Sequence, residues 1–333
     1  MKIITNYNID KDKWRLLLKS SIFESPFQTQ EYFNLFNSVK GLSADVFAVE
    51  EESEYTALAV VTQQKELGFK GYLSRRGILY GGPLVAPNKR ESLDILLNSI
   101  INHYKSKLIY IELRLFFDYS KYISESLSKY WEYLPYLNIR LDLSGKDMEE
   151  ILLDMKYNRR RQINLSLERN AFYKECTTEE ELFLLYNILL ELYKNRVKLP
   201  LFDYKYFQSL WKSDIGKVFL VIHNNKIIGG SFCVAIKNHS IYTMYYCGIR
   251  DYDKKIFPTH LAILAAIEYG IKNGMKYLDF MGAGLKGKEY GVRKYKQEFG
   301  GEMNEYGRYR KIIQPILFKI GEAGLNILKK MKI

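Results

Sequence analysis

The sequence predicts an α/β protein in which one α/β unit occurs twice in tandem. Its 333 residues are 47% hydrophobic and 26% charged, which is typical of a globular chain with room for two domains of ordinary size. A hairpin, a helix and a buried strand follow one another in each half of the chain. The two halves align at an offset of about 170 residues, with Val46 opposite Val218 and Ile109 opposite Tyr277.

This repeat sets the domain boundaries that we expect. We assign a first domain to residues 1–145 and a second domain to residues 146–310. We expect residues 311–333 to form a C-terminal helix that packs on the fold.

The first half opens with a short aromatic-rich helix that Thr29 caps. Runs rich in β-branched and aromatic residues then predict a hairpin over 46–62. A strand pair interrupted by glycines is expected over 71–85, a helix over 91–107 and a buried strand over 108–116.

The second half repeats this order. We expect a hairpin over 217–236 that turns at Asn224 and Asn225, and then a strand over 240–249. Apolar residues at helical spacing predict a helix over 259–272 with Thr259 as its cap. A buried strand follows over 277–281.

A helical pattern lies between the halves. Apolar residues at helical spacing predict a helix from Met148 to Ile163, and Lys156 and Arg160 lie four residues apart on one of its faces. Acidic residues lie near the start of this helix and basic residues near its end, an order that the helix dipole favours by itself. A guanidinium group also suits the oxygens of a pyrophosphate. The pair is therefore either a solvated helix end or a site for an anion.

The stretch from Tyr277 to Gly301 carries the strongest pattern for a site. Its apolar run ends in closely spaced glycines, which predict a tight turn or a close approach of the backbone to another group. A cluster of cations follows, comprising Lys286, Lys288, Arg293, Lys294 and Lys296. Such a cluster can bind an anion, and it can also be an ordinary basic surface loop.

The charge and the cysteine content narrow the classes of partner and of protein that fit this sequence. The formal net charge of +12 favours anionic partners, such as phosphate-bearing precursors, tRNA or the acidic inner leaflet of a membrane. Three cysteines without a CxxC pair predict reduced thiols in a cytoplasmic protein, and we expect no metal site. The sequence holds no GxSxG elbow, P-loop or HExxH motif, which argues against a hydrolase, a P-loop NTPase and a zincin.

No signal peptide or membrane span is expected. The N-terminus lacks an apolar core, and no run approaches 18 apolar residues. The segment over 312–333 is apolar and basic, with Lys319, Lys329, Lys330 and Lys332. It either packs on its own domain or lies as an amphipathic helix on a bilayer. We therefore expect a cytoplasmic protein that could contact the inner face of the membrane.

Three segments resemble the Fem-type transferases, which build peptidoglycan interpeptide bridges and belong to the GNAT acyltransferase superfamily. The first is the strand end Asp-Phe-x-Gly with the later run from Tyr290 to Gly301, which ends in Lys-x-x-Phe-Gly-Gly. The second is the Ser-Pro-Phe-Gln opening at Ser25, and the third is the Met-Lys-x-x-x-Arg helix at Met155. The resemblance covers nearly the whole chain.

This resemblance implies two tandem GNAT-like domains with mixed sheets and, because no long heptad insertion is present, no coiled-coil arm. It implies that Lys156 and Arg160 hold a phosphate-bearing acceptor, and we add Arg75 and Arg76 as helpers. By the same family pattern Lys296 lies at the reacting carbonyl. We assign it to the oxyanion or to the donor's phosphate, with Lys294 as the alternative. The remaining assigned residues are Tyr290 and Arg293 for substrate binding, with Gly282 and Gly284 for the turn.

The reaction implied is transfer of an activated acyl group to a neutral amine, with stabilisation of an oxyanion. Asp279 and Glu298 are candidate bases, although Asp279 fits better as a cap for the glycine turn. The segment from Arg250 to His260 lacks the glycines with which a GNAT enzyme cradles the CoA pyrophosphate.

We therefore expect an aminoacyltransferase that uses charged tRNA and no tightly bound cofactor, and that acts on the amine of an anionic cell-envelope precursor, either free or lipid-linked. One alternative is an N-acyltransferase that uses acyl-CoA in envelope polysaccharide or lipid synthesis. The other is a nonenzymatic RNA-binding module, since stacking aromatics alternate with lysines from Lys286 to Arg310.

Overall fold

The computed structural model describes residues 1–65 and 71–330, and the side chains of 126 and 325–330 are not described. The chain divides into two compact units. The first consists of Met1–Pro135 with Tyr306–Ile333, and the second of Tyr136–Glu305.

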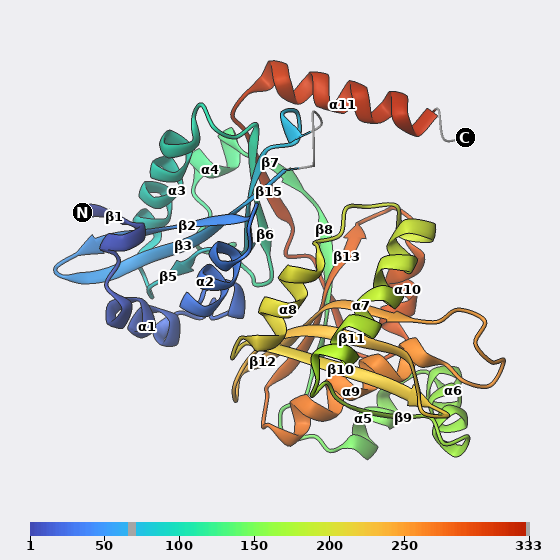
Figure 1. Ribbon diagram of the computed structural model, residues 1–333. Coiled ribbons are helices and arrows are strands. Elements are labelled where there is room, and N and C mark those ends of the chain that lie inside the picture. The colour runs from blue at the N-terminus through green and yellow to red at the C-terminus, as the bar shows by residue number, and fades with distance from the viewer. Residues whose placement is uncertain (66–70, 331–333) are drawn as a thin grey trace. The chain divides into compact units, whose positions relative to one another are not determined.

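The first unit is built on a mixed sheet with the strand order β1-β2-β3-β4-β6-β15-β7, in which β5 pairs with β3 (Figure 1). β4 and β6 run parallel, and the other pairs are antiparallel. The strands are β1 (Lys2–Thr5), β2 (Ser43–Glu51), β3 (Glu54–Gln64), β4 (Arg76–Gly81), β5 (Leu84–Val85), β6 (Tyr110–Leu115), β7 (Glu132–Leu134) and β15 (Arg308–Ile312).

Helix α3 crosses over between the two parallel strands of this unit. Its apolar residues, among them Leu93, Leu96 and Ile100, join those of the sheet in one buried core. The helices of the unit are α1 (Lys11–Ser20), α2 (Gln30–Ser38), α3 (Arg90–Tyr104), α4 (Glu125–Tyr130) and α11 (Pro315–Lys330), with 3-10 turns at Asn6–Asn8 and Pro26–Gln28. Thr29 caps α2 as expected, because its hydroxyl accepts from the Tyr32 amide at 3.2 Å.

Helix α11 packs in part on its own unit. The Phe318 ring meets the Tyr110 ring edge-on at 5.6 Å, whereas Ile316 and Ile320 are exposed. Lys319 is also exposed. The side chains of Lys329 and Lys330, and the whole of Lys332, lie outside the described residues. In the described part of the chain, no helix has the length and apolar character needed to cross a bilayer.

The second unit repeats the scheme with the strand order β14-β8-β13-β12-β11-β10-β9. β12 and β13 are the parallel pair. The strands are β8 (Tyr136–Asp142), β9 (Phe172–Glu175), β10 (Gly216–His223), β11 (Lys226–Ile236), β12 (Ser240–Gly248), β13 (Tyr277–Leu285) and β14 (Glu302–Asn304). The helices are α5 (Met148–Asp154), α6 (Tyr157–Glu168), α7 (Glu179–Leu192), α8 (Tyr204–Lys212), α9 (Pro258–Lys272) and α10 (Gly291–Gln297), with a π-helical turn at Tyr193–Val197.

Helices cover both faces of the second sheet. Cys233 of β11 belongs to the core that α9, α5 and α6 close, whereas its neighbour Phe232 packs against Phe207 of α8 with ring centroids 4.6 Å apart. Alternate residues of β11 are therefore buried on opposite faces. This explains why β11 reads as an almost continuous apolar run in the sequence.

The predicted repeat is confirmed by the sheet topology. In each unit a three-stranded antiparallel run, β2-β3-β4 or β10-β11-β12, leads through a helix of 15 residues into a parallel strand, β6 or β13. The expected hairpins, crossover helices and buried strands all lie at these positions. One detail differs: α9 begins at Pro258, with Phe257 and not Thr259 in the N-cap position.

The boundaries between the two units differ from the domain boundaries that the repeat predicted. We placed residues 136–142 in the first domain and residues 308–310 in the second. β8 instead pairs with β13 and β14, and β15 inserts between β6 and β7. Each sheet is thus completed by a strand that follows the other unit's segment in sequence, which no local pattern reveals.

The helix expected from Met148 to Ile163 is two helices. The chain leaves the helical conformation at Met155 and Lys156, whose ψ angles are 148° and 138°. The Lys156 amide donates to the carbonyl of Glu298 at 3.1 Å. A contact with a distant segment therefore takes the place of an intrahelical hydrogen bond, and the apolar periodicity continues across the break.

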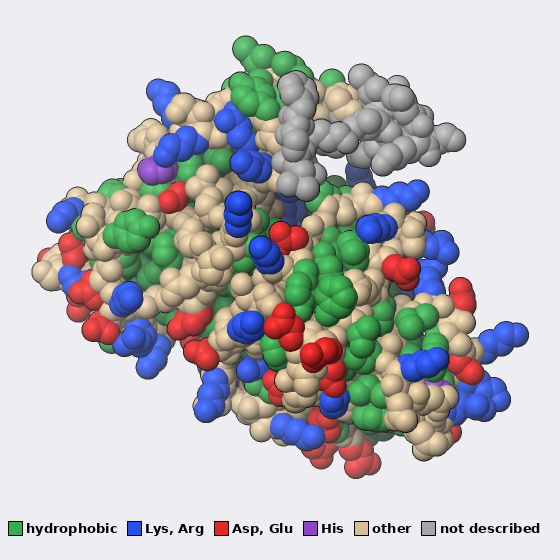
Figure 2. Space-filling model, in the orientation of Figure 1, with side chains coloured by type: hydrophobic (Ala, Val, Ile, Leu, Met, Phe, Trp, Pro, Cys, Tyr) green, Lys and Arg blue, Asp and Glu red, His purple; other side chains and the backbone are tan. Residues whose placement is uncertain are grey.

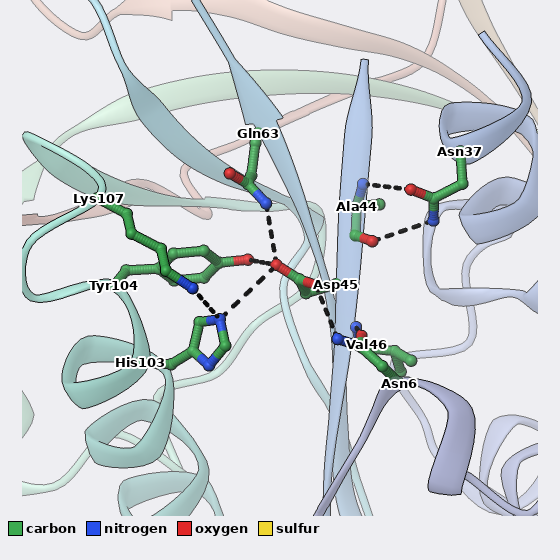
Figure 3. A network of polar contacts seen from close by, with 9 residues as sticks. All are labelled: Asn6, Asn37, Ala44, Asp45, Val46, Gln63, His103, Tyr104 and Lys107. Carbon is green, nitrogen blue, oxygen red and sulfur yellow. Dashed lines mark hydrogen bonds and ion pairs between the residues drawn. The ribbon is translucent and has the colours of Figure 1, made fainter. Parts of the chain in front are cut away.

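A polar network ties the start of the first unit together (Figure 3). The Asp45 carboxylate on β2 accepts from the Tyr104 hydroxyl at 2.5 Å, from Gln63 at 2.9 Å and from Asn6 at 2.8 Å. Burial and the Asp45 charge raise the pKa of Tyr104, so its hydroxyl stays a proton donor. The carboxylate thereby joins α3, β3 and the end of β1.

We expect Tyr104→Phe to lower the free energy of unfolding by about 1–2 kcal/mol, because a hydrogen bond to a charged acceptor is lost while Gln63 and Asn6 still satisfy the carboxylate. Denaturant titration measures the difference. Tyr130→Phe is the control, since Tyr130 is exposed. Equal stabilities of the two variants would show that the network contributes nothing measurable.

Candidate active site

The two parallel strands of the second unit separate where β13 becomes irregular. β12 and β13 pair from Ser240 opposite Tyr277 to Tyr242 opposite Asp279. Beyond that point the register of β13 with β8 shifts twice, at residues 279–282 and at 282–285. Met281 has a φ of 58°, which is uncommon for a residue with a side chain. Strained backbone of this kind persists only where its surroundings hold it.

Asp279 holds this irregular segment. Its Oδ1 accepts from the Met281 amide at 2.6 Å, and its Oδ2 lies 3.3 Å from the guanidinium of Arg140. The residue is fully buried, and burial raises the pKa of Asp279 against the opposing effect of Arg140. The carboxylate caps the turn, as the sequence favoured. It is enclosed by protein, so it is poorly placed to take a proton from a substrate.

Lys296 reaches the same segment from helix α10. Its Nζ donates to the carbonyl of Phe280 at 2.5 Å and to the carbonyl of Gly282 at 2.9 Å. The residue is 6% exposed, and burial lowers the pKa of Lys296 to about 8, although Asp279 opposes the shift. An ammonium group has three donors, so these two bonds leave one for another acceptor.

The glycine segment at the end of β13 is shaped by residues that we expected to bind substrate. The strand expected over 277–281 continues to Leu285, so Gly282 and Gly284 lie within it. The Arg293 guanidinium donates to the carbonyls of Ala283 at 2.8 Å, Lys288 at 3.0 Å and Leu285. Gly284 has a φ of 81°, and a Cβ there would lie 2.8 Å from the Tyr290 ring. These side chains therefore hold the loop, while Tyr290 stays 45% exposed. Lys294 is exposed on α10.

The predicted acceptor pair lies at the start of α6. Lys156 is exposed and occupies the N-cap position. Arg160 donates to the carbonyls of Leu152 and Leu153 at 3.2 and 3.3 Å, and so caps the C-terminal end of α5. Part of the Arg160 guanidinium is thus used by the fold, as the helix-end interpretation predicts.

Arg75 and Arg76 belong to the first unit. Arg75 lies 4.6 Å from the centre of the Tyr72 ring and donates to the Tyr72 carbonyl at 3.3 Å. Arg76 begins β4 and donates to the carbonyl of Ser74 at 3.2 Å. The group that the structure gathers around β13 and α10 is made of second-unit residues.

Sequence reasoning missed a buried arginine, Arg159. It is 3% exposed, and its guanidinium donates to Glu298 at 2.6 Å. A usable signal was present: Arg159 precedes the buried residues Ile163 and Ser166 by four and seven positions, which places it on the inner face of α6. Glu298, a candidate base, is thereby held in an ion pair.

A pocket of about 400 Å³ lies between the end of β12 and the start of α9. Its lining runs from Gly248 to His260 and mixes two cations, Arg250 and Lys254, with two acids, Asp251 and Asp253. Few amides point freely from the helix start. Pro258 has none, and the Phe257 amide donates to the Ser166 hydroxyl at 2.9 Å. The backbone cradle expected of a CoA pyrophosphate site is therefore weak here.

Comparisons with known proteins agree with this geometry. Residues 154–297 match the family described as an acetyltransferase (GNAT) domain. The crystal structure of FemX has a TM-score of 0.72 at 14% sequence identity, and the match covers 96% of this chain and 99% of that chain. The chain therefore has a Fem-like fold of two tandem GNAT units, as the sequence resemblance implied.

Two further structures share the fold. One is the C-terminal domain of a putative lysylphosphatidylglycerol synthetase from Agrobacterium fabrum, with a TM-score of 0.60, 11% identity and 95% of each chain covered. The other is a tandem GNAT protein from the clavulanic acid biosynthesis pathway, with a TM-score of 0.56, 10% identity, and 94% of this chain and 99% of that chain covered. A search of curated protein sequences gives no match.

The burial of His260 beside this site predicts that the free energy of unfolding decreases in acid. Burial, and next to it the Arg159 charge, lower the pKa of His260 to about 3. An unfolded histidine titrates near pH 6.5, so the unfolded state binds the proton first as the pH falls. The contribution of His260 is therefore complete above about pH 6.5 and is lost progressively toward pH 3, by a few kcal/mol at most.

Denaturant titrations at several pH values test this expectation. His239, whose pKa burial and nearby cations lower to about 4, adds a slope of the same sign. We therefore expect His260→Gln to have a shallower decline than the wild type and not a flat one. Parallel curves for the two proteins would contradict the prediction.

Proposed function

We propose that this protein is an aminoacyltransferase that moves an amino acid from charged tRNA to the amine of an anionic cell-envelope precursor, with Lys296 at the chemistry. The observation that carries the proposal is the buried Lys296 ammonium at the place where β12 and β13 separate. Two of its donors are fixed on backbone carbonyls and one is left over. A GNAT domain spans this segment, so acyl transfer is the chemistry to explain.

In this reaction the neutral amine attacks the ester carbonyl of the donor, the new C–N bond forms, and the carbonyl oxygen becomes an oxyanion. The oxyanion then collapses, the ester C–O bond breaks, and the tRNA oxygen leaves and takes a proton from water to become a hydroxyl, while the attacking nitrogen gives up a proton. Lys296 would donate to the oxyanion from a site that excludes water, where such a bond is strongest. Since Asp279 caps a turn and Glu298 pairs with Arg159, the proton goes to a carboxylate of the substrate or to water.

The donor assignment follows from the pocket at the start of α9. Acidic side chains line it together with the cations, and its helix start offers few free amides for a pyrophosphate. One structural neighbour supports an aminoacyl donor by its name, a putative lysylphosphatidylglycerol synthetase, whereas the name of the tandem GNAT neighbour mentions AcCoA. For the acceptor, the exposed Lys156 and the partly exposed Arg160 present positive charge at one helix start.

Transfer from acyl-CoA in envelope polysaccharide or lipid synthesis is the second candidate. Its support from the pocket is limited to the two cations, Arg250 and Lys254, which could bind phosphates beside α9. The RNA-binding alternative gains less support. On the face shown in Figure 2, lysine and arginine side chains are interspersed with acidic ones, and they do not form one continuous basic stripe.

The donor is tested by incubating the purified protein and a peptidoglycan precursor with charged tRNAs and, in parallel, with acyl-CoAs. We expect product with charged tRNA. Product with acyl-CoA alone would keep the acyltransferase and overturn the donor. Absence of product in both arms, with salt-sensitive binding of RNA, would overturn transfer altogether.

The role of Lys296 is tested by the pH dependence of kcat. Because the protonated form is active and its pKa lies near 8, we expect the rate to fall as the pH rises through about 8. Lys296→Arg should remove this decline, since arginine keeps its charge. Lys296→Ala should reduce kcat by about 10²–10³-fold.

Lys294→Ala is the comparison, because Lys294 is the neighbouring lysine exposed on the same helix. A large loss in Lys294→Ala, with Lys296→Ala nearly unaffected, would move the chemistry to the exposed lysine.

A further inference from the structure

The last turn of α10 is held by one side chain from α6. Arg159 donates to the Glu298 carboxylate at 2.6 Å, and its guanidinium lies 4.3 Å from the centre of the Tyr295 ring and 4.6 Å from that of Phe299. Tyr295 and Phe299 stand on either side of Lys296 in the sequence. The residues that Arg159 contacts therefore bracket the lysine that reaches β13.

A histidine holds Arg159 from its other side. The Arg159 guanidinium contacts Nε2 of His260, and the His260 Nδ1 lies 3.1 Å from the Tyr295 hydroxyl. Arginine can only donate, so it needs Nε2 as an acceptor, while the Gln162 Oε1 lies 3.0 Å from the same nitrogen. Burial lowers the pKa of His260 to about 3, so the ring is neutral at pH 7 and does not repel the guanidinium.

Burial of this guanidinium group costs more free energy than burial of an apolar side chain that only fills space. The Arg159 Nε is buried and has no hydrogen-bond partner among the described residues. Arg159 is buried while Glu298 is partly exposed, and an ion pair that withdraws a charge from water is often no more stabilising than apolar residues of the same volume. Helix α10 has seven residues and cannot maintain its own conformation, so its orientation depends on such contacts.

We propose that Arg159 is a positioning residue that fixes the end of α10 and thereby holds the Lys296 ammonium against the carbonyls of β13. The backbone bond from Lys156 to the Glu298 carbonyl adds a second link between the same two helices. Since α6 also carries Arg160, the charged helix start and the lysine are joined through one element. The consequence for catalysis rests on the proposed function, whereas the consequence for the lysine does not.

The first test reads the lysine directly. Labelling with an amine-acylating reagent across a pH series, with mass spectrometry of the Lys296 peptide, reports the pH at which that amine is half deprotonated. We expect about 8 in the wild type and a rise toward the exposed value of about 10.4 in Arg159→Met, as α10 loosens and the ammonium hydrates. Arg161→Met is the matched control, because Arg161 is exposed on the same helix.

Glu298→Gln distinguishes two explanations by the direction in which it changes the pKa of Lys296. Removal of a carboxylate acting directly on Lys296 would lower the lysine pKa, whereas loosening of α10 would raise it. We expect a rise. This variant also keeps the proposal testable if Arg159→Met fails to fold, since Glu298 is partly exposed. An unchanged or lower midpoint in folded Glu298→Gln and Arg159→Met would overturn the proposal.

The second test uses transfer activity in a double-mutant cycle. We expect Arg159→Met to lower kcat by about 10–100-fold with little change in KM, and to have no further effect in a Lys296→Ala background. Arg159→Lys should recover part of the loss. An equal loss in the Lys296→Ala background would overturn the positioning role. If the wild type transfers nothing, the proposed function fails, and the labelling series still decides the role of Arg159.

Discussion

The second unit depends on one ammonium group. It donates hydrogen bonds to backbone carbonyls of β13 where the pairing of that strand becomes irregular. Parallel sheets require every buried carbonyl to find a donor, and the carbonyls of Phe280 and Gly282 find theirs in Lys296. Asp279 supplies the matching acceptor for the Met281 amide. The divergence of the two strands is therefore possible because charged side chains replace the missing ladder.

The same burial shifts the protonation equilibrium of the lysine. Withdrawal from water favours the neutral amine and lowers the pKa of Lys296 to about 8, while Asp279 keeps much of the positive charge in place. A group in this state sits near the balance between charged and neutral forms at physiological pH. The surrounding structure must hold it there, and the contacts of Arg159 with Tyr295, Glu298 and Phe299 provide that support from the neighbouring helix.

The fold places this site through long-range strand pairing. β8 lies beside β13 within the continuous second unit, and β15, which follows that unit in sequence, lies beside β6 in the first. Arg140 of β8 reaches Asp279 because of this pairing. Arg160 and Arg293, which seemed from their charge to be ligands for an anion, donate to backbone carbonyls at the end of α5 and in the glycine segment. Charge in a sequence does not distinguish these two uses.

The sequence by itself determined the tandem repeat, the hairpins, the crossover helices and the buried strand that begins at Tyr277, because apolar periodicity is a local property. The glycine turn that it predicted after residue 281 is instead part of β13, which continues to Leu285. The Fem-like resemblance followed from short runs of residue types. Tertiary structure alone decided the pairing of β8 and β15, the break between α5 and α6, and the burial of Arg159 next to the more exposed Arg160. The reason is physical: each of these depends on a partner more than 100 residues away, such as Glu298 for Arg159 at a separation of 139.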